Sequence, residues 1–239
     1  MHYIPLAAPF FLALFLFFVF LVLLIELRIL EYTYETVGVD RRYIFFLLLL
    51  SFLGSYINIP IAQLPPEKLV TPSVINFFGM QYVIPAVTER PGTVIAVNLG
   101  GAVIPVILSI YLIVRNRLYL RSAMAIGIVA AAVHLMAYTV PGVGIAEPMF
   151  VPPLVTAVVA LAVSRDHAAP LAYIAGSMGT LIGADLLNLH RIQGLGAPVA
   201  SIGGAGKFDG IFLTGLIAVL LASLMARKSK APRSQGSTA

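Results

Sequence analysis

The chain has 239 residues, of which 60% are hydrophobic and 10% charged, and its formal net charge is +5. Soluble domains carry roughly 25% charged residues, so this composition cannot cover a globule in water and excludes an ordinary soluble protein. The absence of cysteine excludes disulfides, a thiolate nucleophile and cysteine metal sites. In a lipid-embedded chain, the excess of basic residues serves membrane orientation rather than nucleic-acid binding.

Apolar runs along the chain predict an all-α membrane bundle of seven transmembrane helices. The first run, from Ile4 to Ile25, lacks the basic start and the small-residue cleavage site of a signal peptide, so we interpret it as a retained helix. The second contains Pro60 near its end, and the fifth has Pro152 and Pro153 in its first turns, where N–H groups lack helical partners. The predicted helices cover residues 4–27, 43–64, 93–114, 122–140, 148–164, 170–189 and 208–226.

The basic residues predict the orientation of this bundle. Eleven fall on one side: Arg28, Arg41, Arg42, Arg115, Arg117, Arg121, Arg165, Arg227, Lys228, Lys230 and Arg233. Four fall on the other side: Lys68, Arg90, Arg191 and Lys207. Because basic residues concentrate in cytoplasmic loops, we expect the N-terminus outside the cell and the C-terminus in the cytoplasm.

The polar stretches predict one transmembrane domain over residues 1–228 and no second domain. Residues 26–42 form a cytoplasmic connector that can extend the first helix, and residues 229–239 form a disordered cytoplasmic tail. The stretch 65–92 contains the apolar run 74–85 and then Glu89-Arg90-Pro91-Gly92, and another β-branched run follows it. This pattern predicts a hairpin or small cap on the outer face.

Ionisable side chains at membrane depth are costly, which makes each one a functional candidate. Three acids lie in or at the start of a predicted helix: Asp185, Asp209 and Glu147. Asp185 lies about one turn inside the outer end of the sixth helix, and Asp209 lies in the first turn of the seventh. Consecutive helices are antiparallel, so these two carboxyl groups can face each other near the outer membrane surface.

Structural roles compete with this interpretation. Asp209 can complement the positive end of its own helix dipole, which is worth roughly 0.3–1 kcal/mol. Asp185 lies near a helix C-terminus, where the dipole disfavours an anion, and it can instead pair with His190 or Arg191. The glycines of segment 179–183 form a small-xxx-small ridge on which another helix can approach closely.

Two carboxyl groups a few ångströms apart share one proton, because both cannot ionise cheaply. The ionised group can take a proton from water while the protonated group polarises a peptide carbonyl. This is general acid–base hydrolysis without a metal or a covalent intermediate.

The segment from Gly203 to Gly206, followed by Asp209 and Gly210, resembles the Gly-x-Gly-Asp segment of presenilin-type intramembrane aspartyl proteases. In that family one catalytic aspartate ends the sixth helix and the other begins the seventh. The resemblance, which covers about 45 residues, implies that Asp185 and Asp209 are a catalytic dyad.

The chain also departs from that pattern. Lys207 and Phe208 separate the glycines from the aspartate, and Ala184 stands where the family has a tyrosine. The family's Pro-Ala-Leu element, on a later helix, has no counterpart in the expected place.

Across its length, the chain more closely resembles an uncharacterised family of prokaryotic multi-pass membrane proteins, domain of unknown function 1614. The residues that carry this resemblance are Asn58-Ile59-Pro60 and the segments 95–105 and 208–215. It implies a multi-pass helical fold and no established activity.

Other polar groups in the outer half of the bundle predict an outward-facing pocket. Asn98 precedes Gly100 and Gly101, and Pro105 is expected to kink the helix there. Considered alone, His134 is better interpreted as a core histidine that forms hydrogen bonds with neighbouring hydroxyl groups. The predicted substrate-binding residues are Asn58, Asn98, His134, Glu147, Gly204, Gly206 and Gly210, and His190 can join the pocket.

From these patterns we expect an aspartyl-type intramembrane hydrolase in the cytoplasmic membrane, with lipids and a transmembrane peptide as partners. We expect no nucleic acid and no cofactor. We also expect no resident metal, because no His-Glu-x-x-His spacing occurs. The alternatives are a membrane protein that binds or transports a small solute or ion, including a divalent metal, and a non-enzymatic structural membrane protein. A transporter would be expected to show an inverted repeat, and none is detectable.

Overall fold

A computed structural model describes residues 7–77, 80–90, 92–140, 144–193, 197–204 and 210–229. Within these residues the chain forms seven α-helices: α1 (Ala7–Val37), α2 (Arg41–Gly54), α3 (Ile104–Asn116), α4 (Tyr119–Met136), α5 (Val151–Val163), α6 (Ala168–Thr180) and α7 (Gly210–Ser229). Three segments, Leu99–Asn116, Tyr119–Met136 and Ala168–Arg191, are helical, long and apolar enough to cross a membrane. The predicted helical class is therefore confirmed.

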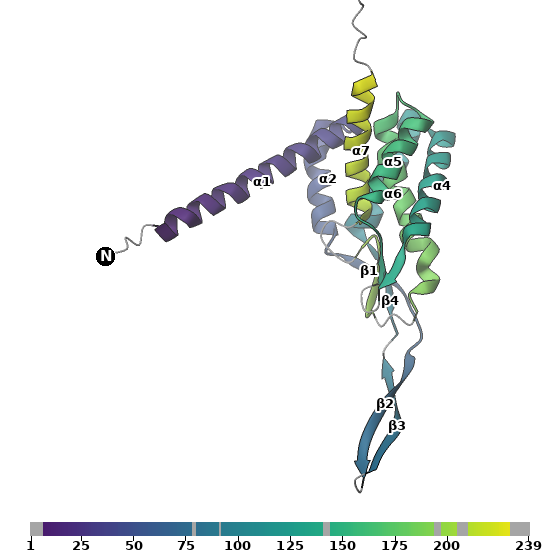
Figure 1. Ribbon diagram of the computed structural model, residues 1–239. Coiled ribbons are helices and arrows are strands. Elements are labelled where there is room, and N and C mark those ends of the chain that lie inside the picture. The colour runs from purple at the N-terminus through teal and green to yellow at the C-terminus, as the bar shows by residue number, and fades with distance from the viewer. Residues whose placement is uncertain are drawn as a thin grey trace, which may run out of the picture.

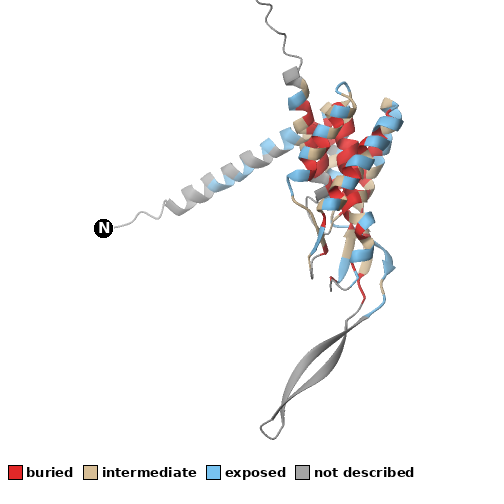
Figure 2. Cartoon of the chain, turned by 45° about the vertical axis from the view of Figure 1, so that its right-hand side comes forward, coloured by how far each residue is buried: buried red, intermediate tan, exposed pale blue. Residues whose placement is uncertain are grey.

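Helix α6 forms the centre of the bundle, with α3, α4, α5 and α7 packed around it (Figure 1). Residues 171–177 of α6 are all buried. By contrast, Leu120 and Leu135 on α4 are 74% and 85% exposed, and Figure 2 shows the buried residues concentrated inside the bundle. Large apolar side chains on the outer surface fit a lipid environment.

Small residues let the helices approach closely. A Cβ on Gly183 would overlap the carbonyl oxygen of Ala130, and one on Gly179 would lie 2.7 Å from Val129 Cγ1. The predicted small-xxx-small ridge is thus confirmed as the contact between α6 with its extension and α4. On another side of α6, a Cβ on Gly176 would lie 3.0 Å from Gly215 Cα of α7.

Short strands gather at one end of the bundle (Figure 1). A three-stranded sheet has the order β1 (Asn58–Gln63), β4 (Val94–Asn98), β7 (Val199–Ile202). The β1–β4 pair is antiparallel and the β4–β7 pair is parallel. The strands β2 (Glu67–Phe77) and β3 (Met80–Arg90) form the hairpin predicted within residues 65–92, and β5 (Tyr138–Val140) pairs with β6 (Gly144–Ala146).

Three predicted helix boundaries are wrong. The second helix ends at Gly54, and Pro60 lies in β1 rather than in a helix. The residue before a proline favours extended backbone, so Ile59 and Pro60 fit a strand better than a helix. The third helix does not begin at residue 93, because 94–98 is a strand, and the fourth ends at Met136, before strand β5. These short runs are apolar and β-branched, and such runs fit a buried strand as well as a helix.

Two departures from regular α-helix mark the strand end of the bundle. A π-helical turn, η1 (Leu99–Val103), precedes α3, so Pro105 lies in the first turn of α3 and does not kink its middle. A second π-turn, η2 (Leu181–Asp185), and a 3-10 helix, η3 (Leu186–Arg191), extend α6. Single π-turns inside helices occur often at functional sites, which directs attention to this end.

The opposite end holds the α1–α2, α3–α4 and α5–α6 connections and the end of α7 (Figure 1). Helix α1 continues to Val37, which confirms that the connector partly extends the first helix. At this end the rings of Tyr34 and Tyr173 are buried 6.1 Å apart, joining α1 to α6. Apart from Ser229, the predicted tail lies outside the described residues.

Candidate functional site at the strand end

A buried asparagine ties the sheet to the first π-turn. Asn98 ends β4 and is 1% exposed. Its Nδ2 donates to the Ser55 carbonyl at 2.8 Å and to Asn58 Oδ1 at 3.0 Å. Its Oδ1 accepts from Gly101 N at 2.8 Å, so the side chain caps η1. The amide therefore fixes α2, β1 and η1 around β4.

Asn58 extends this network to the third strand. Its Oδ1 also accepts from Ser201 Oγ at 2.6 Å, which connects β1 to β7 by side chains across the central strand. Asn58 and Asn98, both predicted to bind substrate, thus contact each other. Their roles as ligands stay predictions, and the observed bonds give both a structural role.

We expect Asn98→Ala to lower the free energy of unfolding by about 2–4 kcal/mol, because it leaves buried backbone groups at Ser55 and Gly101 without their partner. Denaturant or thermal unfolding in detergent micelles measures this loss. The control is Asn116→Ala, which removes a single bond to Leu112 O within α3. Equal losses in the two variants would contradict the network's role.

Two glycine backbones meet where η1 touches the end of β7. A Cβ on Gly101 would overlap the carbonyl oxygen of Gly203. Gly203 and Gly204 have φ values of +88° and +86°, which L side chains rarely adopt. Gly204 N donates to Ser201 O at 3.2 Å and closes this turn. The glycines predicted from the Gly-rich segment therefore shape a tight turn after β7.

Asp185 binds this turn. Gly203 N donates to Asp185 Oδ2 at 2.7 Å, and the carboxylate is half-buried at the last residue of η2. A carboxylate that accepts a backbone N–H makes a charge-assisted bond, which is stronger than a neutral one. The bond holds the end of η2 against the segment that leads into α7.

The start of α7 packs in the same region, and we call the meeting point of η1, η2, β7 and the start of α7 the junction. Ile211, in the first turn of α7, packs in one buried cluster with Ala102 of η1, Leu181 of η2 and Ile202 of β7. The backbone of Gly210 begins α7. Asp209 and Gly206 lie outside the described residues. The structure therefore brings Asp185 to Gly203, which precedes Asp209 by six residues in sequence.

Other polar atoms lie close to η2. His134, half-buried on α4, has a buried Nδ1 with no hydrogen-bond partner among the described residues. Asn188 is buried, and its Nδ2 donates to the carbonyls of Gly183 and Ala184 at 2.8 and 3.0 Å. Its Oδ1 has no partner within the described part of the chain. Glu147, half-buried, follows β6, a strand that contacts η2.

Sequence reasoning missed two members of this region, Ser201 and Asn188. Asn188 lies three residues after Asp185, on the same helical face, and this spacing was the available signal. The sequence around Ser201 contains no such signal, because its hydrogen bond to Asn58 depends on the pairing of β7 with a distant strand. In the described ranges, no group of three or more His, Asp or Glu side chains could hold a metal ion.

Comparison with known proteins gives one match. A family model described as a protein of unknown function, DUF1614, matches residues 52–221. No curated protein and no solved structure matches the chain. The matched stretch runs from the end of α2 into α7 and leaves out α1, so the whole junction lies within it. The resemblance to this family is confirmed, and no match supports the likeness to presenilin-type proteases.

Proposed function

We propose that the chain, which belongs to this family of unknown function, is a membrane-embedded hydrolase in which Asp185 and Asp209 act together on a peptide bond. The observation that carries the proposal is the bond from Gly203 N to Asp185 Oδ2. It anchors one carboxylate on the segment that, six residues later, contains the other.

The positions of the residues along the axes of α6 and α7 support a pairing of Asp185 with Asp209. Gly176 of α6 lies beside Gly215 of α7, and the two helices run in opposite directions (Figure 1). At 1.5 Å per residue, Asp185 lies about 13 Å beyond Gly176, and Gly210 lies about 7 Å beyond Gly215 in the same direction. Asp185 therefore lies a few ångströms past Gly210, the first residue of α7 and the neighbour of Asp209 in sequence.

The chemistry follows from two carboxyl groups that share one proton. The ionised group takes a proton from water as the water oxygen bonds to the peptide carbonyl carbon. The protonated group gives its proton to the carbonyl oxygen, and a tetrahedral diol forms. The C–N bond then breaks as the first carboxyl group gives its proton to the nitrogen and the second, now ionised, takes a proton from one hydroxyl of the diol. The amine and the carboxylic acid leave, and the dyad again holds one proton.

The membrane setting defines the substrate class. The basic residues favour an outside N-terminus and a cytoplasmic C-terminus, which places the junction near the outer face of the cytoplasmic membrane. A transmembrane peptide that reaches this level from the lipid is the substrate we propose.

A transition-state analogue tests the proposal without knowledge of the natural substrate. A peptide with a hydroxyethylene group in place of the scissile amide imitates the tetrahedral diol, and such analogues bind far more tightly than substrates. We expect a photoreactive hydroxyethylene peptide to label the protein reconstituted in vesicles. Asp209→Asn and Asp185→Asn should abolish labelling. Absence of labelling of the unaltered protein, or equal labelling of the variants, would contradict the proposal.

A second candidate function is the binding of a small polar solute beside η2. The buried, unpartnered His134 Nδ1 and Asn188 Oδ1 favour it, because orphan buried polar atoms call for a ligand or water. Asn188 donates to the carbonyl of Gly183, and His134 follows Val133, the α4 residue that contacts Gly183. Under this alternative His134→Ala would impair function more than Asp209→Asn, which is the reverse of the hydrolase expectation.

A further inference from the structure

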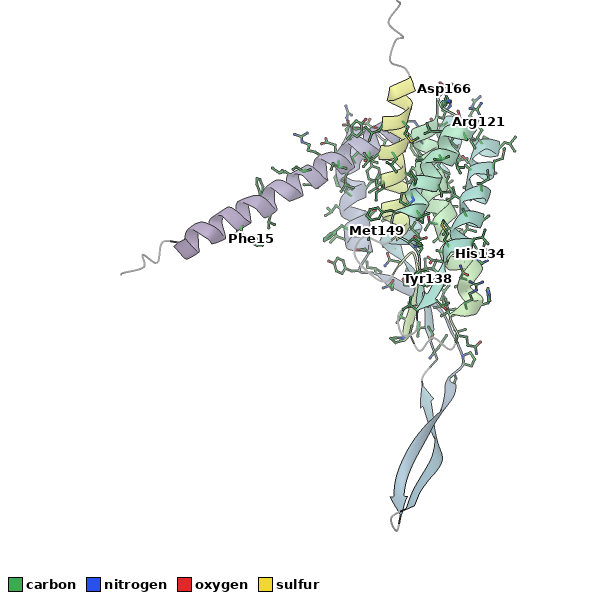
Figure 3. The ribbon with its side chains drawn as sticks, in the orientation of Figure 1. Phe15, Arg121, His134, Tyr138, Met149 and Asp166 are labelled. Atoms are coloured by element: carbon green, nitrogen blue, oxygen red, sulfur yellow. The ribbon has the colours of Figure 1, made fainter. Side chains whose placement is uncertain are left out.

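A large open cavity lies at the end of the bundle opposite the sheet. Its volume is about 1160 Å³, and residues at the ends of α1, α5, α6 and α7 line it. Asp166, in its lining, appears at the far end of the bundle from His134 and Tyr138 in Figure 3. The cavity is therefore separate from the junction that holds Asp185, and the proposed hydrolase does not use it.

The lining changes from charged to apolar along the bundle axis. Arg165 and Asp166, both exposed, lie at the mouth in the α5–α6 turn. Leu161 and Val158 lie four and seven residues earlier on α5, so they continue the same face away from the mouth. The opposite wall is α7, where Ala222 and other small residues leave the space open.

This order of polar mouth and apolar wall matches one class of ligand, a membrane phospholipid. The cavity exceeds the roughly 300–1,000 Å³ usual for small-solute sites. The arginine fork suits a phosphate and, with five donors, can serve more than one acceptor. Asp166 next to it places an anion beside the phosphate position, which disfavours a purely anionic headgroup and favours one that carries an ammonium.

We propose that this cavity binds one phospholipid of the phosphatidylethanolamine type. Its phosphate lies on Arg165, its primary ammonium on Asp166, and its acyl chain along Leu161 and Val158. A bound lipid would fill the opening between the end of α1 and the rest of the bundle, where Tyr32 and Thr36 contribute to the lining.

Native mass spectrometry of the full-length protein, exchanged into an equimolar mixture of phosphatidylethanolamine, phosphatidylglycerol and phosphatidylcholine, tests the proposal. We expect one phosphatidylethanolamine per chain in preference to the other two lipids. Arg165→Gln should weaken its retention about tenfold, as expected for loss of a charge-assisted contact. Ala162→Phe, which fills the cavity from an exposed position on α5, should also weaken it.

The controls separate this site from general surface charge. Arg117→Gln removes the same charge at the α3–α4 turn, outside the cavity, and should leave lipid retention unchanged. Asp166→Asn should shift the preference towards phosphatidylglycerol. Equal losses in Arg165→Gln and Arg117→Gln, no loss in Ala162→Phe, or no preference of the unaltered protein for phosphatidylethanolamine would overturn the proposal. Thermal unfolding of each variant identifies misfolding, and the headgroup shift in Asp166→Asn does not depend on the Arg165 variant.

Discussion

Asp185→Asn is expected to reduce peptide hydrolysis by about 10³-fold or more, because general acid–base catalysis by a positioned group contributes roughly 10²–10⁴. The variant keeps an oxygen that can accept from Gly203 N at the position of Asp185 Oδ2. Its fold and thermal stability should therefore stay close to those of the unaltered protein. The measurement is the rate of cleavage of a fluorogenic transmembrane peptide in vesicles, with unfolding temperatures recorded in parallel.

A matched control is Asp40→Asn. Asp40 is exposed, and its Oδ1 accepts from Arg42 N at the start of α2. Asparagine caps a helix about as well as aspartate, so this exchange removes a carboxylate at the opposite end of the bundle with little structural effect. Its activity should be unchanged. Retained hydrolysis in Asp185→Asn, at unaltered stability, would eliminate the dyad and leave the solute-binding alternative.

Local patterns predicted much of the helical fold. Long apolar runs correctly predicted the seven helices, three of which belong to segments long and apolar enough to cross a membrane. The run 74–85 and the Pro91-Gly92 pair that follows it led to the predicted hairpin, which needs only a tight turn between strands adjacent in sequence. The glycine ridge at 179–183 correctly marked a close helix contact, although sequence did not identify α4 as the partner.

The three-stranded sheet was beyond such patterns. Strand β4 pairs with β7, so Val94 lies opposite Val199, more than a hundred residues away. Pairing at that separation leaves no local signal, and an apolar run such as 94–98 is equally compatible with a helix. The apolar sequence of 43–64 likewise concealed β1. Because of this error, the hydrogen-bond network of Asn98, Asn58 and Ser201 was not predicted. The network forms only when the three strands are aligned.

The candidate site was likewise predicted only in part. Asp185 was found from its depth in an apolar helix, since burial of an ionisable group in a membrane needs a reason. The bond to Gly203 could not be found, because it depends on a π-turn that shifts Asp185 around the helix axis and on a left-handed glycine turn. Gly203 and Gly204 allow the turn, but its contact with η2 comes from packing between η1, η2 and β7.

Gly101→Ala is expected to be the most disruptive single-methyl change at the junction. A Cβ at this position would overlap the carbonyl oxygen of Gly203. The added Cβ would clash with a backbone oxygen, so no flexible side chain can move aside to relieve the overlap. Overpacking of a rigid contact costs about 1–3 kcal/mol and sometimes more. We expect the upper part of that range, measured as a lower unfolding temperature in detergent, together with loss of hydrolysis.

Loss of hydrolysis follows because any shift of Gly203 away from residue 101 also displaces the N–H that holds Asp185. Gly127→Ala on α4 is the control, since a Cβ there has nothing within 4 Å. Alanine is the better helix former by up to about 1 kcal/mol, so this variant should be at least as stable as the unaltered protein and fully active. If Gly101→Ala matched Gly127→Ala in both measurements, the backbone contact between η1 and β7 would not be what positions Asp185.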